Sequence, residues 1–274
     1  MDLPILKVPS APTTETLIRY YHKAASHHVG QIAESEPLDF CTAWSNPQFT
    51  TDVGANRMLD VALPDGMTPS QALVQGTAYF AERGVTCWQW TMNPSAPAEQ
   101  STPMADHLLA SGYRRDVIDI MYLDHLTAGP WSEAGVAEAL KIIPARASFK
   151  HSRALYEDVM GHLDHVAQLT EAAMLRLDDP HYDALIAIKD SAAIAHVGVL
   201  AVGEIGAIYQ LCVTEALRRR GFGTVMMSRA MEICARSLFK HVFLGVTPSN
   251  TAAIQLYTKF GFRKIGEWVE YQKV

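Results

Sequence analysis

Within this sequence, residues 207–239 are the segment whose residue types and spacing best fit an anion-binding site. A strand-like run ends at Val213, and an amphipathic helix reaches about Phe239. Three arginines and two glycines lie between them: Arg218, Arg219, Arg220, Gly221 and Gly223. A strand, a turn and a helix in this order point free backbone N–H groups and the positive end of the helix dipole at one place. Glycines let the backbone come close to a bulky diphosphate, and arginines add paired donors.

The same residues exclude two standard phosphate loops. The segment contains no GxxxxGK[ST] sequence, and its glycine spacing is not GxGxxG. An exposed basic helix start, with glycine for close packing, would give a similar pattern. The loop alone therefore leaves an anion site and a structural helix start as alternatives.

A second segment, from Pro248 to Phe262, follows a strand and has the pattern of a short capped helix. Either Ser249 or Asn250 can cap its N-terminus, and Gly261 can end it. Its larger side chains share one face at helical spacing: Ala253, Ile254, Tyr257 and Phe260. This helix therefore has one side for packing and a defined start and end.

Together the two segments resemble the acetyl-coenzyme A site of the GNAT acetyltransferases. Residues 211–223 are similar to a strand followed by (Q/R)xxGx(G/A), and residues 250–262 are similar to the NxxAxxLYxxxGF motif. Both motifs occur in the order of that superfamily, and the strand pattern extends the resemblance back to about residue 138. The resemblance implies an α/β fold with a mixed sheet, the GNAT acyl-CoA N-acyltransferase fold. It also implies transfer of an acetyl group from acetyl-CoA to a primary amine.

The resemblance assigns roles to residues of both motifs. In GNAT enzymes the strand before the loop splays from its neighbour, so the backbone of Leu211 and Val213 would face the pantetheine and acetyl units. Backbone N–H groups from Arg219 to Thr224 would hold the pyrophosphate, with help from the Arg218 and Arg219 side chains. The expected cofactor-binding residues are Leu211, Cys212, Val213, Arg218, Arg219, Arg220, Gly221, Phe222, Gly223, Thr224, Asn250, Ala253 and Tyr257.

Tyr257 matches the general acid of the GNAT family. When an amine attacks a thioester carbonyl, a thiolate must leave, and a phenol near the sulfur can hydrogen-bond to it or protonate it. A backbone N–H on the splayed strand can stabilise the oxyanion. The alternative is that Tyr257 is a core aromatic on an amphipathic helix.

No general base is evident from the sequence. Ala207 occupies the strand position at which some relatives carry an acidic residue. The weaker candidates are Glu204, Glu215, Tyr209 and His196. The two glutamates fall in a turn and a loop, and a buried structural role is favoured for the other two. A chain of water molecules is a further alternative.

No metal site is expected. Three histidines lie close in sequence but lack accompanying ligands at metal-binding spacing: His151, His162 and His165.

Periodicity and capping signals predict the elements that must position these residues. The expected helices are Thr14–Ala25, a helix capped by Thr68 with Pro69 at its first position and ended by Gly84, Ala105–Ala110 after a loop at 93–103, and a helical region over Ser152–Leu175. The expected strands are Leu38–Trp44, Met58–Leu63, Val85–Met92, Arg114–Leu123, Leu140–Ala145 and Val242–Val246. Three further strands are expected to form an antiparallel meander: Tyr182–Lys189, Ala195–Val202 and Ile205–Val213.

The chain is expected to have two parts. Ser111-Gly112-Tyr113 and Phe260-Gly261-Phe262 each end a helix before a basic strand, which is a weak repeat. The first part contains no (Q/R)xxGx(G/A) sequence. The interpretation is therefore two tandem GNAT-like domains, with a degenerate N-terminal domain at 1–128, a linker at 129–138 and a catalytic GNAT domain at 139–274. An unrelated α/β cap is the alternative for the first part.

Composition limits the partners of the chain. A net charge of −6 and a pI of about 6.0 disfavour nucleic acid. No stretch approaches the ~20 apolar residues that cross a membrane, and the N-terminus lacks a signal-peptide pattern. The cysteines are expected to be buried, reduced thiols: Cys41, Cys87, Cys212 and Cys234.

These observations lead us to expect a cytoplasmic protein, monomer or homodimer, with no nucleic-acid or membrane partner. Its expected acceptor is a small-molecule or peptide amine. Two alternatives remain open: an acyltransferase that uses another acyl donor, and a non-catalytic acyl-CoA sensor or interaction protein.

Overall fold

The structure is a computed structural model that describes residues 11–124, 126, 140–163 and 165–274. The predicted linker at 129–138 and the first ten residues lie outside the described residues. The helices are α1 (Thr14–Gly30), α2 (Pro69–Glu82), α3 (Ala98–Ala110), α5 (Phe149–Met160), α6 (Val166–Arg176), α7 (Phe222–Arg236) and α8 (Thr251–Lys259). The strands are β1 (Glu34–Leu38), β2 (Cys41–Ser45), β3 (Arg57–Val61), β4 (Gln89–Met92), β5 (Tyr113–Leu123), β6 (Lys141–Pro144), β7 (Tyr182–Lys189), β8 (Ala192–Val202), β9 (Ile205–Val213), β10 (His241–Val246) and β11 (Arg263–Lys273).

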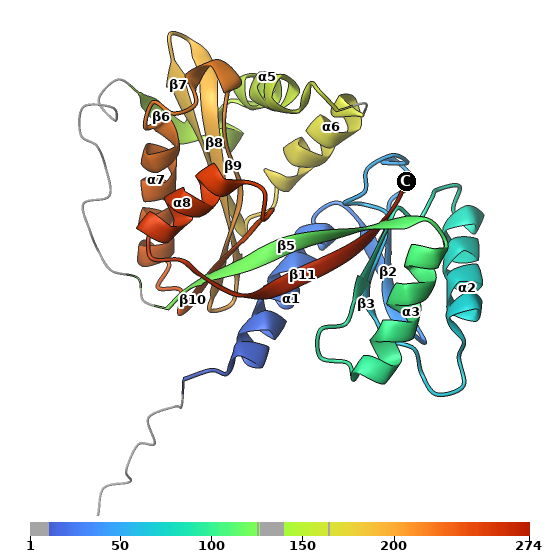
Figure 1. The fold of residues 1–274 in the computed structure, drawn as a ribbon. Coiled ribbons are helices and arrows are strands. Elements are labelled where there is room, and N and C mark those ends of the chain that lie inside the picture. The colour runs from blue at the N-terminus through green and yellow to red at the C-terminus, as the bar shows by residue number, and fades with distance from the viewer. Residues whose placement is uncertain (1–10, 125, 127–139, 164) are drawn as a thin grey trace, which may run out of the picture.

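The described strands form one mixed sheet in which two strands are exchanged between the halves. The order is β1-β2-β3-β4-β11-β5-β10-β9-β8-β7-β6. The last strand of the chain, β11, therefore pairs with β4 of the first half, and β5 of the first half pairs with β10 of the second. Figure 1 shows β5 and β11 running side by side across the middle of the molecule. The two halves are thus joined through hydrogen-bonded backbone.

The exchanged strands begin alike, as the weak repeat predicts. Gly112 and Gly261 precede them with φ of +86° and +91°, a conformation that favours glycine at the end of a helix. The two strands then pair antiparallel along almost their whole length, from Arg263 opposite Tyr122 to Lys273 opposite Tyr113. The equivalent ends of the two halves therefore meet across an approximate two-fold relation.

Alternation along the second-half strands divides their side chains between two layers. Ala195, Val197 and Val199 of β8 pack under α7 and α8, while Leu200 and Val202 pack with α1, α5 and α6 on the other face. Although α1 belongs to the first half, it contacts β8, β9 and β11. A separate core fills the space between α2, α3 and the strands of the first half. No helix within the described residues is long and apolar enough to cross a membrane.

Several local predictions are confirmed. Thr68 caps α2 in a reciprocal capping box with Gln71, and Pro69 is the first helical residue. Gly84 follows the helix with φ of +69°. The three predicted meander strands correspond to β7, β8 and β9, which pair antiparallel in succession.

Other local predictions are wrong where apolar side chains are buried outside a strand. Leu38 to Trp44 is not one strand, because β1 ends at Leu38 and β2 begins at Cys41, with a buried Phe40 in the turn between them. Of the predicted strand Val85–Met92, only Gln89–Met92 is a strand, although Val85 is itself buried.

Helix lengths also differ from prediction. Helix α1 continues to Gly30, and α3 begins at Ala98 because the exposed Pro103 is accommodated within it. The helical region over 152–175 is two helices, because α5 ends at Met160, before Gly161. These differences leave the elements that carry the two motifs unchanged.

Candidate active site

Strands β9 and β10 separate at their carboxyl ends. They pair in parallel from His241 opposite Ile205 to Leu244 opposite Ile208, and no pairing follows. Strand β9 nevertheless stays paired with β8 as far as Val213. Backbone groups of β9 beyond Ile208 are therefore left without a ladder partner on the β10 side. This is the splay that the family resemblance implies.

A bulge in β9 lies at the start of the splay and is held by buried polar groups. Gln210 has φ of +55°, unusual for a residue with a side chain, and the β8–β9 register shifts beside it. Its backbone oxygen accepts a hydrogen bond of 3.0 Å from His196 Nδ1, and its Oε1 accepts from the hydroxyls of Tyr156 and Tyr182 at 2.8 and 3.2 Å. A side chain at Gly198 would collide with the Tyr182 ring, so glycine there permits this contact.

The N-terminus of α7 lies open next to the splay. Gly221 is its N-cap residue with φ of +84°, and no side chain caps the helix. The N–H groups of the first turn of a helix have no partner inside it, so they remain available to an anion. Arg219 also has a positive φ of +64°, and the Arg218 side chain bends back to donate to the Val213 oxygen at 3.2 Å.

Two adjoining cavities bring the predicted residues together. The first is about 440 Å³ and is lined by Leu211, Cys212, Val213, Leu217, Arg218, Arg219, Gly223, Asn250, Ala252, Ala253, Leu256 and Tyr257. The second is about 400 Å³ and is lined by Arg219, Arg220, Gly221, Gly223, Thr224, Ala252, Gln255, Leu256 and Lys259. Among the predicted cofactor residues, only Phe222 lines neither, because its side chain is buried in the core beneath α7.

Helix α8 contributes cavity residues that the two sequence motifs do not predict. Ala252, Leu256 and Lys259 lie about one turn apart, and together with Gln255 they face the second cavity. Asn250 caps this helix by accepting from the Ala253 N–H at 3.2 Å, which leaves Ser249 without that role. The i, i+4 and i+7 spacing of Ala252, Leu256 and Lys259 could have identified this face. Lys259 adds a cation to Arg219 and Arg220, which line the same cavity.

Tyr257 has both properties that the sequence left as alternatives. Its side chain belongs to the core cluster under α7, with 8% of its surface exposed, and it also lines the first cavity. Its hydroxyl has no hydrogen-bond partner among the described residues. Burial, with a smaller contribution from Cys212, raises the pKa of Tyr257 to about 12. The phenol is therefore protonated at neutral pH and free to donate a hydrogen bond into the cavity.

The weaker base candidates lie away from this cavity or are already occupied. Glu204 lies in the turn at the other end of β9, paired with Lys240 at 2.5 Å. Glu215 is exposed in a short 3-10 turn before the arginines. The Tyr209 ring stacks on His28 with 3.9 Å between centroids. None of the residues that line the first cavity, all within the described part of the chain, is Asp, Glu or His.

His196 is fully buried and helps to hold the bulge. Its Nε2 lies 2.9 Å from the Tyr156 hydroxyl, and its Nδ1 donates to the Gln210 oxygen. Burial lowers the pKa of His196 to about 4, against a smaller raising effect of the Gln210 hydrogen bond. The imidazole is therefore neutral, and its contacts assign it to the scaffold beneath the splay.

This low pKa predicts acid sensitivity of the fold. The unfolded chain, with a histidine pKa near 6.5, binds more protons than the folded chain between pH 6.5 and 4, so stability falls as the pH falls through that interval. We expect His196 to contribute up to about 3 kcal/mol of this loss. Urea unfolding of His196→Gln at several pH values should show a shallower dependence than wild type. Equal slopes in the two proteins would contradict the prediction.

The histidines considered for metal binding do not gather. His151 Nδ1 bonds to Ser148 Oγ at 2.6 Å, and its Nε2 lies 3.2 Å from the Ser191 oxygen. His165 lies at the start of α6. Neither belongs to the group of ligand-type side chains that does come together in the described structure, which is His27, Asp179 and His181.

Comparison with known proteins agrees with this geometry. Residues 141–262 match the Acetyltransferase (GNAT) family. This part of the chain belongs to the GNAT family. The matched GNAT segment contains the splayed strands, the open helix N-terminus and Tyr257.

A curated relative and two solved structures extend the comparison. N-alpha-acetyltransferase 50 of Danio rerio is 29% identical over 109 residues, which is 35% of this chain and 65% of that protein. A GCN5-related N-acetyltransferase from Kribbella flavida superposes with a TM-score of 0.61 at 13% identity, covering 93% of this chain and 95% of that one. A functionally unknown conserved protein from Staphylococcus epidermidis gives 0.63 at 12% identity, covering 88% and 94%. The GNAT fold thus extends over both halves, and the predicted fold class is confirmed.

Proposed function

We propose that the protein transfers an acetyl group from acetyl-CoA to a primary amine. The observation that carries the proposal is the meeting of three features in adjoining cavities. These are the splay of β9 from β10 beyond Ile208, the uncapped N-terminus of α7 at Gly221, and the unpartnered hydroxyl of Tyr257. Each would bind one part of an acyl-CoA, in the same order: the pantetheine arm, the pyrophosphate and the sulfur.

The residues present fit such a donor. Backbone groups of Leu211 and Val213 can bond to an extended pantetheine in place of the missing β10 ladder. The N–H groups from Gly221 to Thr224 can hold a pyrophosphate, and the cations of Arg219, Arg220 and Lys259 line the same cavity. No side chain blocks the helix N-terminus, so the phosphate site needs no rearrangement to open.

The reaction requires the protein to stabilise an oxyanion and a leaving thiolate. A bound thioester supplies an activated carbonyl carbon for the amine to attack. A backbone N–H of the splayed strand can stabilise the negative charge that develops on the carbonyl oxygen. Tyr257, held protonated by its raised pKa, donates a hydrogen bond or a proton to the departing sulfur. The amine proton leaves to water, since no carboxylate or imidazole lines the first cavity.

The acceptor is proposed only as a primary amine of a small molecule or peptide. The zebrafish relative is named an N-alpha-acetyltransferase, which favours including α-amines among those assayed. Coenzyme A release should therefore be measured with free amines and with short peptides that have an unblocked N-terminus. Acetyl-CoA should be compared with longer acyl donors, because the cavity residues do not fix the acyl group.

A second function is favoured by one specific observation. A first cavity without Asp, Glu or His is also what a non-catalytic acyl-CoA sensor would have. The sensor predicts tight acyl-CoA binding with no coenzyme A release for any amine. Turnover with any amine would exclude it.

The donor site is tested by a substitution that strains the phosphate loop. Gly221 has φ of +84°, and an L side chain in that conformation costs about 1–2 kcal/mol. We expect Gly221→Ala to weaken coenzyme A binding about tenfold, measured by calorimetry. Gly203→Ala is the matched control, because Gly203 has φ of +61° in the β8–β9 turn, remote from both cavities.

The two variants separate loss of fold from loss of the site. Both should lower the free energy of unfolding, but only Gly221→Ala should change the dissociation constant of coenzyme A. Failure of folded wild-type protein to bind coenzyme A would overturn the proposed function. Equal weakening in both variants would show that the loop at Gly221 is not the phosphate site.

A further inference from the structure

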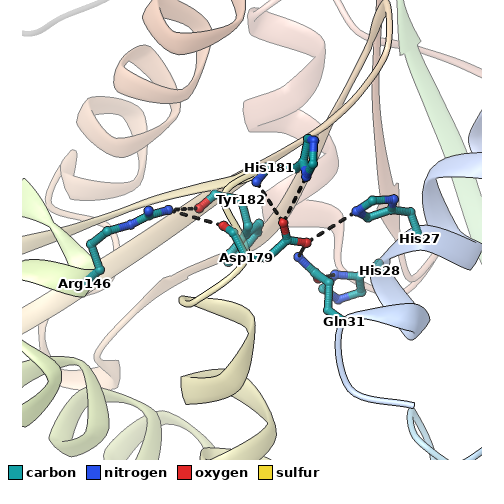
Figure 2. Close-up of polar contacts among 7 residues, drawn as sticks. All are labelled: His27, His28, Gln31, Arg146, Asp179, His181 and Tyr182. Carbon is teal, nitrogen blue, oxygen red and sulfur yellow. Dashed lines mark hydrogen bonds and ion pairs between the residues drawn. The ribbon is translucent and has the colours of Figure 1, made fainter. Parts of the chain in front are cut away.

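A cluster of ligand-type side chains lies away from the donor cavities, where α1 meets the second half. His27 is in the last turn of α1, while Asp179 and His181 lie between α6 and β7. His27 is 152 residues from Asp179 in sequence, whereas Asp179 and His181 are two residues apart. One ligand atom from each lies within 4.8 Å of the other two. Figure 2 shows the carboxylate of Asp179 between the two imidazoles.

We propose that His27, Asp179 and His181 bind one divalent transition-metal ion, Zn²⁺ in the first instance. Two imidazole nitrogens and one carboxylate oxygen are a ligand set that zinc accepts, with a water molecule in the fourth position. The site is distinct from the acyl-CoA cavities, and it does not depend on the proposed function.

The distances favour ligands that share an ion. His27 Nε2 lies 3.3 Å from Asp179 Oδ2, and His181 Nδ1 lies 3.2 Å from Asp179 Oδ1. Charged hydrogen bonds between such groups are usually shorter, about 2.7–2.9 Å. Two ligands held ~2.0–2.1 Å from a tetrahedral ion are roughly 3.3–3.4 Å apart. Each imidazole lies at about that distance from a different oxygen of Asp179, so an ion shared by all three residues would require a small rotation of the side chains or a carboxylate that binds through both oxygens.

Surrounding groups already orient the carboxylate. Gln31 Nε2 donates to Asp179 Oδ2 at 2.8 Å, and the backbone N–H of His181 donates to Oδ1 at 2.8 Å. The other end of the Gln31 amide lies 2.8 Å from His28 Nδ1, which fixes its orientation. Such outer contacts commonly hold metal ligands in place.

The loop itself is anchored, and the site is open to solvent on one side. Arg146 Nη2 donates to the backbone oxygens of Tyr182 and Asp179 at 2.7 and 3.4 Å, as Figure 2 shows. The side chain of Asp179 is 15% exposed, whereas those of His27 and His181 are 36% and 61% exposed. An ion can therefore enter without local unfolding, and it would fasten α1 to the loop before β7.

The proposal is tested by titrating Zn²⁺ into untagged, EDTA-treated protein at pH 7.5. We expect one equivalent to bind and raise the melting temperature, with no effect of Mg²⁺, which prefers an all-oxygen site. Asp179→Asn and His181→Ala should each weaken binding more than tenfold, and Gln31→Ala, which keeps all three ligands, about tenfold. His151→Ala is the control, because His151 lies outside the cluster.

The possible outcomes are decisive in either direction. Co²⁺ in place of Zn²⁺ should give the strong visible absorption of a four-coordinate ion, and Asp179→Asn should abolish it. Zinc binding that is absent in wild type, or unchanged in both Gln31→Ala and His181→Ala, would overturn the proposal. If Asp179→Asn does not fold by circular dichroism, the Gln31→Ala and His181→Ala affinities still decide the question.

Discussion

Replacing Tyr257 by phenylalanine should lower kcat about 100-fold, the lower end of what a positioned acid contributes. The dissociation constant of coenzyme A should change little, because the ring and its packing against Phe262 are retained. The free energy of unfolding should also be nearly unchanged, since the lost hydroxyl has no partner among the described residues. Stopped-flow or steady-state release of coenzyme A with an identified amine measures the effect.

Tyr113→Phe is the matched control for this experiment. Tyr113 and Tyr257 are equally exposed, at 8% each, but Tyr113 lies in the core of the first half. Its variant should keep full turnover. An unchanged kcat in Tyr257→Phe would remove the acid role and leave Tyr257 as a packing residue.

The raised pKa of Tyr257 leads to a prediction for the pH dependence of kcat. A group with a pKa of about 12 stays protonated throughout the neutral range. The pH profile of kcat should therefore show no alkaline fall from Tyr257 below about pH 10, the pKa of an ordinary phenol. A fall near pH 8 or 9 that disappears in Tyr257→Phe would show that the phenol titrates much earlier than its burial predicts.

Separating the halves should abolish folding of both. Without residues 1–128, the second half loses β5 from between β10 and β11, and it also loses α1 from the face of β8 and β9. Without residues 139–274, β4 and β5 lose the strand that joins them. Because unpaired buried backbone groups cost free energy, we expect each fragment alone to be unfolded or aggregated.

Mixing the two fragments during refolding should restore structure and coenzyme A binding. Circular dichroism and calorimetry on each fragment, on the mixture and on the intact chain measure this. The experiment also tests the division of the chain near residue 128. A soluble 139–274 fragment with native circular dichroism and wild-type coenzyme A affinity would show that the second half is an independent domain.

Features that depend on neighbouring residues could be predicted from the sequence. Thr68, Pro69 and Gly84 define α2 because caps and breakers act within a few residues. The proposed donor site could be suggested from the sequence for the same reason, since its glycines, arginines and Asn250 fall in two short motifs. Phe222 shows the limit of this reasoning, because a position whose backbone lies at the cavity directs its side chain into the core.

Features that depend on distant pairing could not be predicted in this way. The exchange of β5 and β11 brings together segments about 150 residues apart, and neither strand carries a local signal for its partner. The approach of His27 to Asp179 is equally non-local. The prediction of one strand from Leu38 to Trp44 is wrong for another reason. Phe40 is buried within a turn, and an apolar pattern shows that side chains are buried but not that the backbone is extended.

The exchanged strands have a consequence for synthesis of the chain on the ribosome. Most domains in a longer chain can fold as soon as their own residues have emerged. Here β4 and β5 lack the strand that lies between them, β11, until Lys273 has left the exit tunnel. The edges of β4 and β5 therefore stay open during translation of the whole second half. Nascent chains of this protein should remain sensitive to protease, and should bind chaperones, until the last strand is released.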